Sequence, residues 1–248
     1  MKEKEEQRLN ELKEIDKSYF KEGYNYICGI DEAGRGPLAG PVVAGAVILP
    51  KGKRILYVND SKKLSEKKRD ELFDVIKEEA LSYGIGIVSP ERIDEINILQ
   101  ATYDSKKVSE KKREKLYELI IEEAISYSVG IVDQNEIDRI NILNATKAGL
   151  TEAVRTLKVK PELILVDALT NIDTCGVPYK SIIKGDAKSY SIAAASIIAK
   201  VTRDRIMREW DKVYPQYGFE KHKGYGTAAH ISAIKENGLC PLHRLSFV

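Results

Sequence analysis

Apolar and polar positions follow two different spacings along this chain, and each spacing predicts one type of element. Near the N-terminus, apolar side chains recur every three or four residues within a highly charged segment, which predicts a docked helix over residues 1–22. The apolar face of that helix consists of Leu9, Leu12, Ile15, Tyr19 and Phe20. Two apolar runs follow within 26–50, and the glycine- and proline-rich turn between them predicts a hairpin of two strands.

Strands and helices alternate in the rest of the chain. Apolar runs in ELILVDAL and YKSIIKGD predict strands, whereas TKAGLTEAVRTL and AKSYSIAAASIIAKVTRDRIMREW have helical spacing. A glycine-rich loop, KHKGYGT, precedes a last helix, AAHISAIKENG, and the tail CPLHRLSFV. This order predicts an α/β fold with a mixed sheet flanked by helices, an antiparallel hairpin at its start and a helical C-terminal part.

The middle of the chain contains a tandem repeat. Residues 60–102 and 104–146 align with an offset of 44, and 27 of the 43 aligned pairs are identical. Each copy predicts a helix with an apolar stripe, a short strand and the start of a second helix. Two copies are too few for a solenoid, which needs about three units to bury a continuous core. We interpret the repeat as a duplication within one domain; a second functional site, with Lys62 and Lys106 each contacting a phosphate, is the alternative.

Composition and charge limit the possible functions. With 248 residues, 43% of them hydrophobic and 31% charged, the chain is typical of a globular protein with one sizeable core. No apolar run approaches the roughly 18 residues of a membrane span, and three unpaired cysteines without metal-ligand spacing favour a cytoplasmic location. Because the net charge is only +2, a nucleic-acid site would have to come from local patches.

Carboxylates stand at the ends of several predicted strands. Asp31 and Glu32 directly follow the apolar run 26–30, Asp167 ends LILVD, and Asp186 ends IIKGD. Because ligands gather beyond the carboxyl ends of strands in an open α/β sheet, these acids are expected to meet in space. Clustered carboxylates stay ionised together only when cations neutralise them, and oxygen ligands suit Mg²⁺ or Mn²⁺. Two such ions could clamp the attacking and leaving oxygens of a phosphodiester.

Each acid taken alone also has a structural interpretation. Asp186 precedes a predicted helix and could be its N-cap, and Asp167 precedes a loop and could be a turn residue. The pair Asp31 and Glu32 favours function more strongly, because two adjacent acids directly after a buried strand are costly unless they are used.

The segment GIDEAGRGPLAGPVVAGAVIL resembles the signature of the ribonuclease HII family. Later blocks that are similar to that family follow in the family's order: NDSKKLS, LILVDA, GDAKSYSIAAASIIAKVTRDR, YPQYGFEKHKGYGT and CPLHR. The resemblance covers nearly everything outside the N-terminal helix and one copy of the repeat; the duplication itself is not part of the family pattern. The resemblance implies a ribonuclease H-like fold and an enzyme that cuts the RNA strand of RNA–DNA hybrids, or cuts at ribonucleotides embedded in duplex DNA.

The resemblance also implies roles for particular residues. Asp31, Glu32, Asp167 and Asp186 match the family's metal-binding acids, and are therefore the expected catalytic residues, with two ions of Mn²⁺ or Mg²⁺ when substrate is bound. In that mechanism a water held on one ion attacks in line, a 3′-hydroxyl leaves and a 5′-phosphate remains on the product.

Recognition of the ribose is expected from two glycine-rich elements. The family's glycine–arginine–glycine element matches Gly34, Arg35 and Gly36, and its ribose-sensing tyrosine matches Tyr225. Glycines let backbone groups approach a sugar closely, and the 2′-OH distinguishes RNA from DNA. The alternative for Tyr225 is a loop aromatic that packs on the core.

Phosphate contacts are expected from one predicted helix and from the repeat. Ser196, Lys200 and Arg203 share a helical face at spacings of four and three residues, and Lys62 lies in the first repeat copy. A solvated basic flank of the helix is the alternative. The three histidines, which are expected to be structural because they lack ligand spacing, are His222, His230 and His243.

These features together predict an N-terminal helix over 1–22 and one ribonuclease H-like catalytic domain over 23–248 that contains the repeat. The expected partner is an RNA–DNA hybrid or a ribonucleotide-containing duplex and no membrane; the chain is expected to be a monomer, with self-association through the repeat as a possibility. Two alternatives stay open: a strand-transfer or junction-cleaving nuclease of the same fold, and a hybrid-binding protein that the duplication has inactivated.

Overall fold

The computed structural model describes residues 2–52, 114, 117–118, 120–121 and 124–248. Its centre is a five-stranded sheet in the order β3-β2-β1-β4-β5. The strands are β1 (Ile27–Ala33), β2 (Val42–Ile48), β3 (Ser126–Val132), β4 (Leu163–Asp167) and β5 (Tyr179–Ile182). The pairs β1–β2 and β2–β3 are antiparallel, whereas β1–β4 and β4–β5 are parallel. The predicted mixed sheet with an antiparallel hairpin at its start is confirmed.

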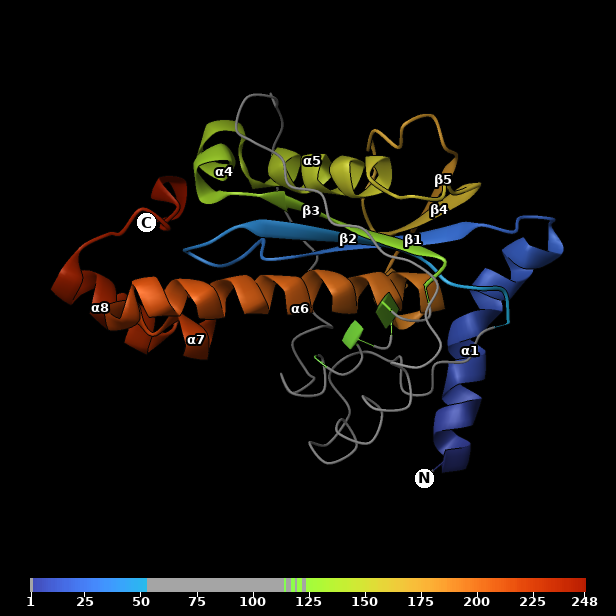
Figure 1. Cartoon of the computed structure of the whole chain (residues 1–248), viewed down its shortest axis with the longest axis horizontal. Helices are drawn as coiled ribbons and strands as arrows, with labels where there is room; N and C mark the ends of the chain where they lie inside the picture. Colours follow the sequence, from blue (N-terminus) through green and yellow to red (C-terminus); the bar gives the residue numbers. More distant parts are fainter. Residues whose placement is uncertain (1, 53–113, 115–116, 119, 122–123) are drawn as a thin grey trace.

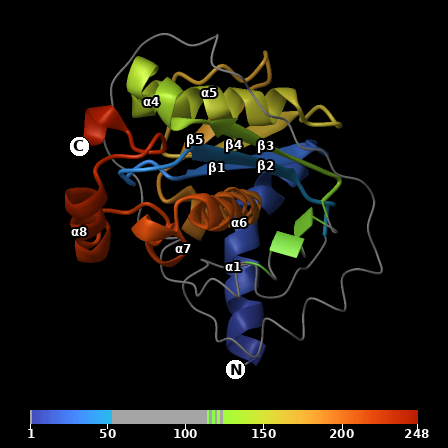
Figure 2. The same cartoon turned by 60° about the vertical axis from the view of Figure 1, so that its left-hand side comes forward.

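Helices cover both faces of this sheet (Figure 1). One face carries α4 (Gln134–Ile140) and α5 (Ile142–Arg155), and the other carries the long helix α6 (Tyr190–Val213). The helix α1 (Lys2–Lys21) lies on the α6 side, as the turned view in Figure 2 also shows. Its predicted apolar face is docked, since Leu9 and Leu12 are buried and Ile15, Tyr19 and Phe20 pack against a neighbouring cluster.

Close approach between sheet and helix depends on two glycines. A Cβ on Gly29 of β1 would collide with the backbone of Ser191, and one on Gly45 of β2 would lie 2.6 Å from the carbonyl oxygen of Ala195. Both contacts are with α6, so any side chain at either position would push the helix off the sheet. Odd-numbered positions of β1 therefore face α6, and even-numbered positions such as Cys28 and Ile30 face the cluster on the α5 side.

The long helix begins later than the sequence suggested. Its first residue is Tyr190, and Ser189 is the N-cap, whose side chain accepts a hydrogen bond from the N–H of Ile192. Asp186 lies before this cap, in a single 3₁₀ turn, η2 (Gly185–Ala187). The N-cap interpretation of Asp186 is therefore wrong, because Ser189, three residues later, is the N-cap.

The second repeat copy forms one edge of the sheet. Its strand β3 pairs with β2 over seven residues, from Val42 opposite Val132 to Ile48 opposite Ser126. Tyr117 and Ile120 of the same copy are buried in the core cluster that includes α6, and Arg205 of α6 forms ion pairs with Glu114 and Glu118. The first copy, with Lys62, and Lys106 of the second lie outside the described residues.

Short helices gather at the C-terminal end of α6 (Figure 1). They are η3 (Pro215–Tyr217), α7 (Phe219–His222), α8 (Ala228–Asn237) and η4 (Leu245–Phe247). This is the helical C-terminal part that the sequence predicted. None of the helices in the described ranges has both the length and the apolar composition that a membrane crossing requires.

Candidate active site

Two of the predicted acids stand side by side on neighbouring strands. In the parallel pair of β1 and β4, Ile30 is opposite Val166, so the next residues in the same register are Asp31 and Asp167. Equivalent positions of paired strands project from the same face of a sheet, and for Asp31 this is the face that α6 covers. Asp31 and Glu32 lie within β1 and not after it, because the pairing with β2 continues to Ala33.

Asp186 reaches the same region by a different route. The turn η2 lies close to the end of β4, where the N–H of Gly185 donates a 2.7 Å hydrogen bond to Oδ1 of Asp167. This bond fixes the carboxylate of Asp167 against the turn that carries Asp186. The sequence placed Asp186 at a strand end, but β5 stops at Ile182, four residues earlier.

The other three acids act electrostatically on Asp31. Burial raises the pKa of Asp31 well above its ordinary value, and the negative charges of Glu32, Asp167 and Asp186 raise it further. Burial also raises the pKa of Glu32 to about 7, against the opposing effect of Arg35, whose Nη1 lies 3.2 Å from Oε1 of Glu32. The cluster therefore has more carboxylates than its nearby positive charge can neutralise.

The donor set fits divalent cations. Oε2 of Glu32 is buried and has no hydrogen-bond partner in the described part of the chain, which leaves an acceptor for which an ion is the natural partner. Within the described ranges, no three Asp, Glu, His or Cys side chains are close enough to enclose an ion by themselves. In this geometry an ion at the cluster would thus be held by at most two of the four acids and would take its other ligands from water and substrate, which is how Mg²⁺ usually binds to proteins.

The glycine–arginine–glycine element follows β1 directly. Gly34 has φ +99°, and a Cβ there would collide with the side chain of Arg203 and lie 2.6 Å from the carbonyl oxygen of Pro41. Gly36 is exposed, and nothing lies within 4 Å of where its Cβ would be. The first glycine is thus required by packing inside the protein, and the second keeps the surface open beside the acids.

Tyr225 lies in the loop between α7 and α8 and is partly buried. Its ring centroid is 5.9 Å from Nζ of Lys200 and 5.8 Å from Cζ of Arg203. The preceding Gly224 has φ +81°, and its carbonyl oxygen accepts a 2.8 Å hydrogen bond from the N–H of Leu38. This bond holds the tyrosine loop next to the segment that follows the glycine–arginine–glycine element.

The basic helical face that was expected to meet phosphates is buried. Arg203 has no exposed surface, and its guanidinium donates to the carbonyl oxygens of Pro41, Ala39 and Lys223 at 2.9–3.1 Å. Lys200 forms a buried ion pair with Asp204, and Ser196 donates to the carbonyl oxygen of Ala193. Neither the phosphate-binding prediction for Arg203 nor its alternative of a solvated flank fits, because the core closes over this face.

Sequence reasoning assigned no role to two buried residues. Arg244 has no exposed surface and donates hydrogen bonds to the carbonyl oxygens of Gly34, Arg35 and Gly40. Asp16 of α1 accepts hydrogen bonds from Ser189 Oγ and from the N–H and Oγ of Ser191, so it ties α1 to the start of α6. The block CPLHR contains Arg244, but neither its role nor that of Asp16 can be read from the sequence, because each acts through partners more than 150 positions away.

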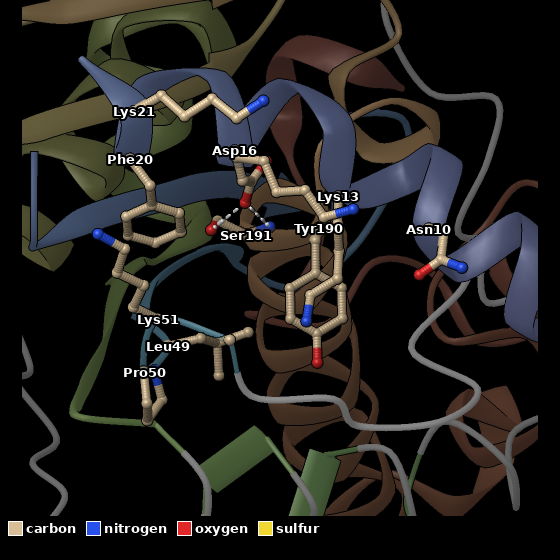
Figure 3. Close-up of a pocket in the computed structure, with 12 residues that line it drawn as sticks. Asn10, Lys13, Asp16, Phe20, Lys21, Leu49, Pro50, Lys51, Tyr190 and Ser191 are labelled. Carbon is tan, nitrogen blue, oxygen red and sulfur yellow. Dashed lines mark hydrogen bonds between the residues drawn. The ribbon is translucent and has the colours of Figure 1, made fainter. Parts of the chain in front are cut away.

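A cavity of about 500 Å³ lies beside Asp16, between α1, the end of β2 and the first turn of α6. Figure 3 shows Lys13 beside Tyr190 and Asp16 pointing at Ser191. Burial raises the pKa of Asp16. None of the predicted site residues lines this cavity, so the candidate active site is the carboxylate cluster and not the cavity.

Comparisons with known proteins point to one family. The family model described as ribonuclease HII matches residues 28–103 and 80–248 in two overlapping segments. The chain is 50% identical to a ribonuclease HII of Ruminiclostridium cellulolyticum, over 99% of this chain and 78% of that protein. It is 49% identical to a ribonuclease HII of Clostridioides difficile with the same coverage.

A solved structure shares the fold. The crystal structure of ribonuclease H2 from Pyrococcus horikoshii superposes with a TM-score of 0.58 at 26% sequence identity, covering 89% of this chain and 93% of that one. The family model covers nearly all of the chain, and the relatives are similar over almost its whole length. The chain therefore belongs to the ribonuclease HII family, which confirms the prediction of an RNA–DNA hybrid endoribonuclease.

Proposed function

We propose that Asp31, Glu32, Asp167 and Asp186 are the catalytic residues of this enzyme, and that they hold two ions of Mn²⁺ or Mg²⁺ once a hybrid is bound. The observation that carries this proposal is the buried carboxylate cluster, in which the charges of Asp167 and Asp186 raise the pKa of Asp31 and Glu32 and Oε2 of Glu32 has no partner among the described residues. When bound, such ions neutralise the acids and polarise the scissile phosphodiester.

The protein's own residues have distinct tasks in this proposal. Asp167 is oriented by the N–H of Gly185, so its carboxylate keeps one position as substrate enters. Arg35 holds one oxygen of Glu32 and leaves the other for the metal site. Burial excludes competing water from Asp31, which strengthens its attraction for a cation.

Substrate selection in this proposal depends on the ribose. The exposed backbone at Gly36 and the ring of Tyr225 are the groups that could contact a 2′-hydroxyl and the adjoining sugar. A ribonucleotide within a hybrid, or a single one embedded in duplex DNA, would both satisfy this arrangement. Hydrolysis then leaves a 3′-hydroxyl and a 5′-phosphate.

The decisive experiment uses a labelled DNA duplex that carries one ribonucleotide, with an all-DNA duplex of the same sequence as the control. We expect cleavage of the first duplex only, in Mn²⁺ or Mg²⁺, and none in excess chelator. End analysis should give the 3′-hydroxyl and 5′-phosphate. Cutting of the all-DNA duplex would favour a junction nuclease, and tight binding without turnover in either metal would favour an inactivated binding protein.

A further inference from the structure

The C-terminal residues 240–244, here called the C-terminal brace, form a buried junction between the two glycine-rich loops. The N–H of Gly40 donates to the carbonyl oxygen of Leu242 at 2.8 Å, and the N–H of Arg244 donates to that of Leu38 at 2.9 Å. Since Leu38 also donates to Gly224, the segment 38–40 has the brace on one side and the tyrosine loop on the other. The brace is therefore connected to both loops through one short segment.

Arg244 fixes the peptides of the glycine–arginine–glycine element. Its Nη2 donates to the carbonyl oxygen of Gly34 at 2.6 Å and its Nη1 to that of Arg35 at 3.0 Å. The structure describes no cis peptide bond, and in a trans peptide the C=O and the following N–H point in opposite directions. Arg244 thus turns the N–H groups of Arg35 and Gly36 away from itself.

His243 and His230 connect the brace to Tyr225. Nδ1 of His243 lies 2.9 Å from the backbone nitrogen of Cys240, which can only donate, and 3.2 Å from the carbonyl oxygen of Cys240, which can only accept. The shorter contact assigns the proton of His243 to Nε2. That proton can be donated to Nε2 of His230, 3.2 Å away, and His230 then carries its own proton on Nδ1. Nδ1 of His230 lies 3.0 Å from the carbonyl oxygen of Tyr225, which can only accept.

This chain of donors needs both histidines to be neutral, and their surroundings keep them so. His230 has no exposed surface and stacks on His222 with ring centroids 4.4 Å apart. Phe219 packs edge-on against His230 at 5.5 Å. Burial lowers the pKa of His230 to about 4 and also lowers that of His243.

We propose that the C-terminal brace determines ribose specificity, with Arg244, His243 and His230 as positioning residues that set the glycine–arginine–glycine peptides and Tyr225 at the spacing of one ribonucleotide. None of the three has enough exposed surface to contact substrate, so each acts through the groups that it holds. The inference rests on the proposed function, in which those two loops recognise the sugar.

The test compares two amide substitutions of the same buried residue. His230→Asn keeps an N–H donor near the Nδ1 position, whereas His230→Gln carries its amide at the Nε2 side and leaves the carbonyl of Tyr225 without this donor. We expect kcat on the single-ribonucleotide duplex to fall about tenfold in His230→Gln and to stay within about twofold of the parent in His230→Asn. In both variants the inhibition constant of an all-DNA duplex should be unchanged, because phosphate contacts are intact.

Controls separate this inference from the proposed function. A parent protein that does not cut the single-ribonucleotide duplex would contradict the proposed function and not the inference about the brace. Equal kcat values in the parent and in folded His230→Gln would overturn the inference about the brace. Equal losses of kcat in His230→Gln and His230→Asn would also overturn it, because they would show that His230 has only a structural role. Tyr225→Ala gives the reference loss for complete removal of the ring.

A measurement on the parent protein keeps the inference testable if the variants do not fold. The ¹⁵N shifts of labelled histidine report which ring nitrogen carries the proton. We expect the Nδ1–H form at His230 and the Nε2–H form at His243 near neutral pH. The opposite tautomer at His230, or a charged ring, would break the chain to Tyr225 and overturn the proposal.

Discussion

Two groups of buried charges lie within this one protein, and they differ in how their charge is compensated. The carboxylates of Asp31 and Glu32 are buried next to further acids, and both have a raised pKa. The guanidinium groups of Arg203 and Arg244 are buried as deeply, and burial lowers the pKa of each; for Arg244 the nearby charge of Arg203 adds to this and brings the value to about 9. Like charges therefore oppose one another in both groups.

The difference lies in the hydrogen bonds. Each arginine donates to three separate backbone carbonyl groups, so its charge is spread over oriented dipoles that the fold itself supplies. In the acid cluster, Oε2 of Glu32 has no partner among the described residues, and Arg35 supplies a counter-charge that lowers the pKa of Glu32 without offsetting its burial. A buried charge that the fold satisfies belongs to the scaffold, and one that it leaves unsatisfied marks the place of a ligand.

Loss of an acid should have the largest effect on activity and almost none on stability. Asp167→Asn keeps the shape and an acceptor for the N–H of Gly185, but it removes a charge from the metal site. We expect turnover of a hybrid to fall by about a thousandfold or more, with hybrid binding largely intact. The melting temperature should stay the same or rise, because repulsion with Asp31 is removed.

The matched control is Asp173→Asn, at an exposed loop position, which should leave kcat at the parent value. Near-normal turnover of Asp167→Asn in saturating Mg²⁺ would show that the catalytic centre lies elsewhere.

Loss of a buried arginine should have the opposite effect, with a large decrease in stability. Arg203→Met preserves much of the side-chain volume but leaves the carbonyl groups of Ala39, Pro41 and Lys223 without this donor. We expect the free energy of unfolding to fall by about 3–5 kcal/mol in urea titrations. Arg205→Met removes partly exposed ion pairs on the same helix and should cost at most about 1 kcal/mol. Equal costs for the two variants would contradict the distinction between them.

Acid titration should reveal the buried histidine. The pKa of His230 is lowered from 6.5 to about 4, so between these values the unfolded chain binds a proton that the folded protein does not. The free energy of unfolding should therefore decrease as the pH falls from about 6.5 to about 4, by at most about 3 kcal/mol from this residue.

The buried acids with a raised pKa change stability in the opposite direction, because the folded protein binds their protons more readily. The contribution of His230 is thus measured as the difference between the parent and His230→Phe. A difference that does not depend on pH in this window would show that His230 is charged or solvated in the folded protein.

The smallest effect is expected from removing the first repeat copy. Excision of 60–103 joins Asn59 to Asp104, so the junction reads VNDSKKVSEKKR in place of VNDSKKLSEKKR. The second copy already supplies β3, with Tyr117 and Ile120 in the core, and both buried-charge groups lie outside the excised segment. We expect kcat on a hybrid within about twofold of the parent and a melting temperature that is equal or higher. An unfolded or insoluble product would mean that both copies belong to one core.

The sequence by itself determined the alternation of elements, the apolar face of α1 and the hairpin of β1 and β2, and it predicted which acids form the site. These features are local: the spacing of apolar residues reports which face of an element is buried, and DEAGRGP or GYGT is read within a few positions. The spacing of Ser196, Lys200 and Arg203 was equally clear, but spacing alone could not tell a face that meets phosphates from one that the core covers.

Only the tertiary structure decided which charges are satisfied. Arg244 contacts carbonyl groups about two hundred positions earlier in the chain, and His230 receives its orientation through His243 from Cys240. Ser189, the N-cap of α6, likewise donates to Asp16 of α1, 173 positions earlier in the chain. Partners so distant in sequence leave no periodic trace, because their pairing is set by how the sheet and helices pack and not by neighbours along the chain.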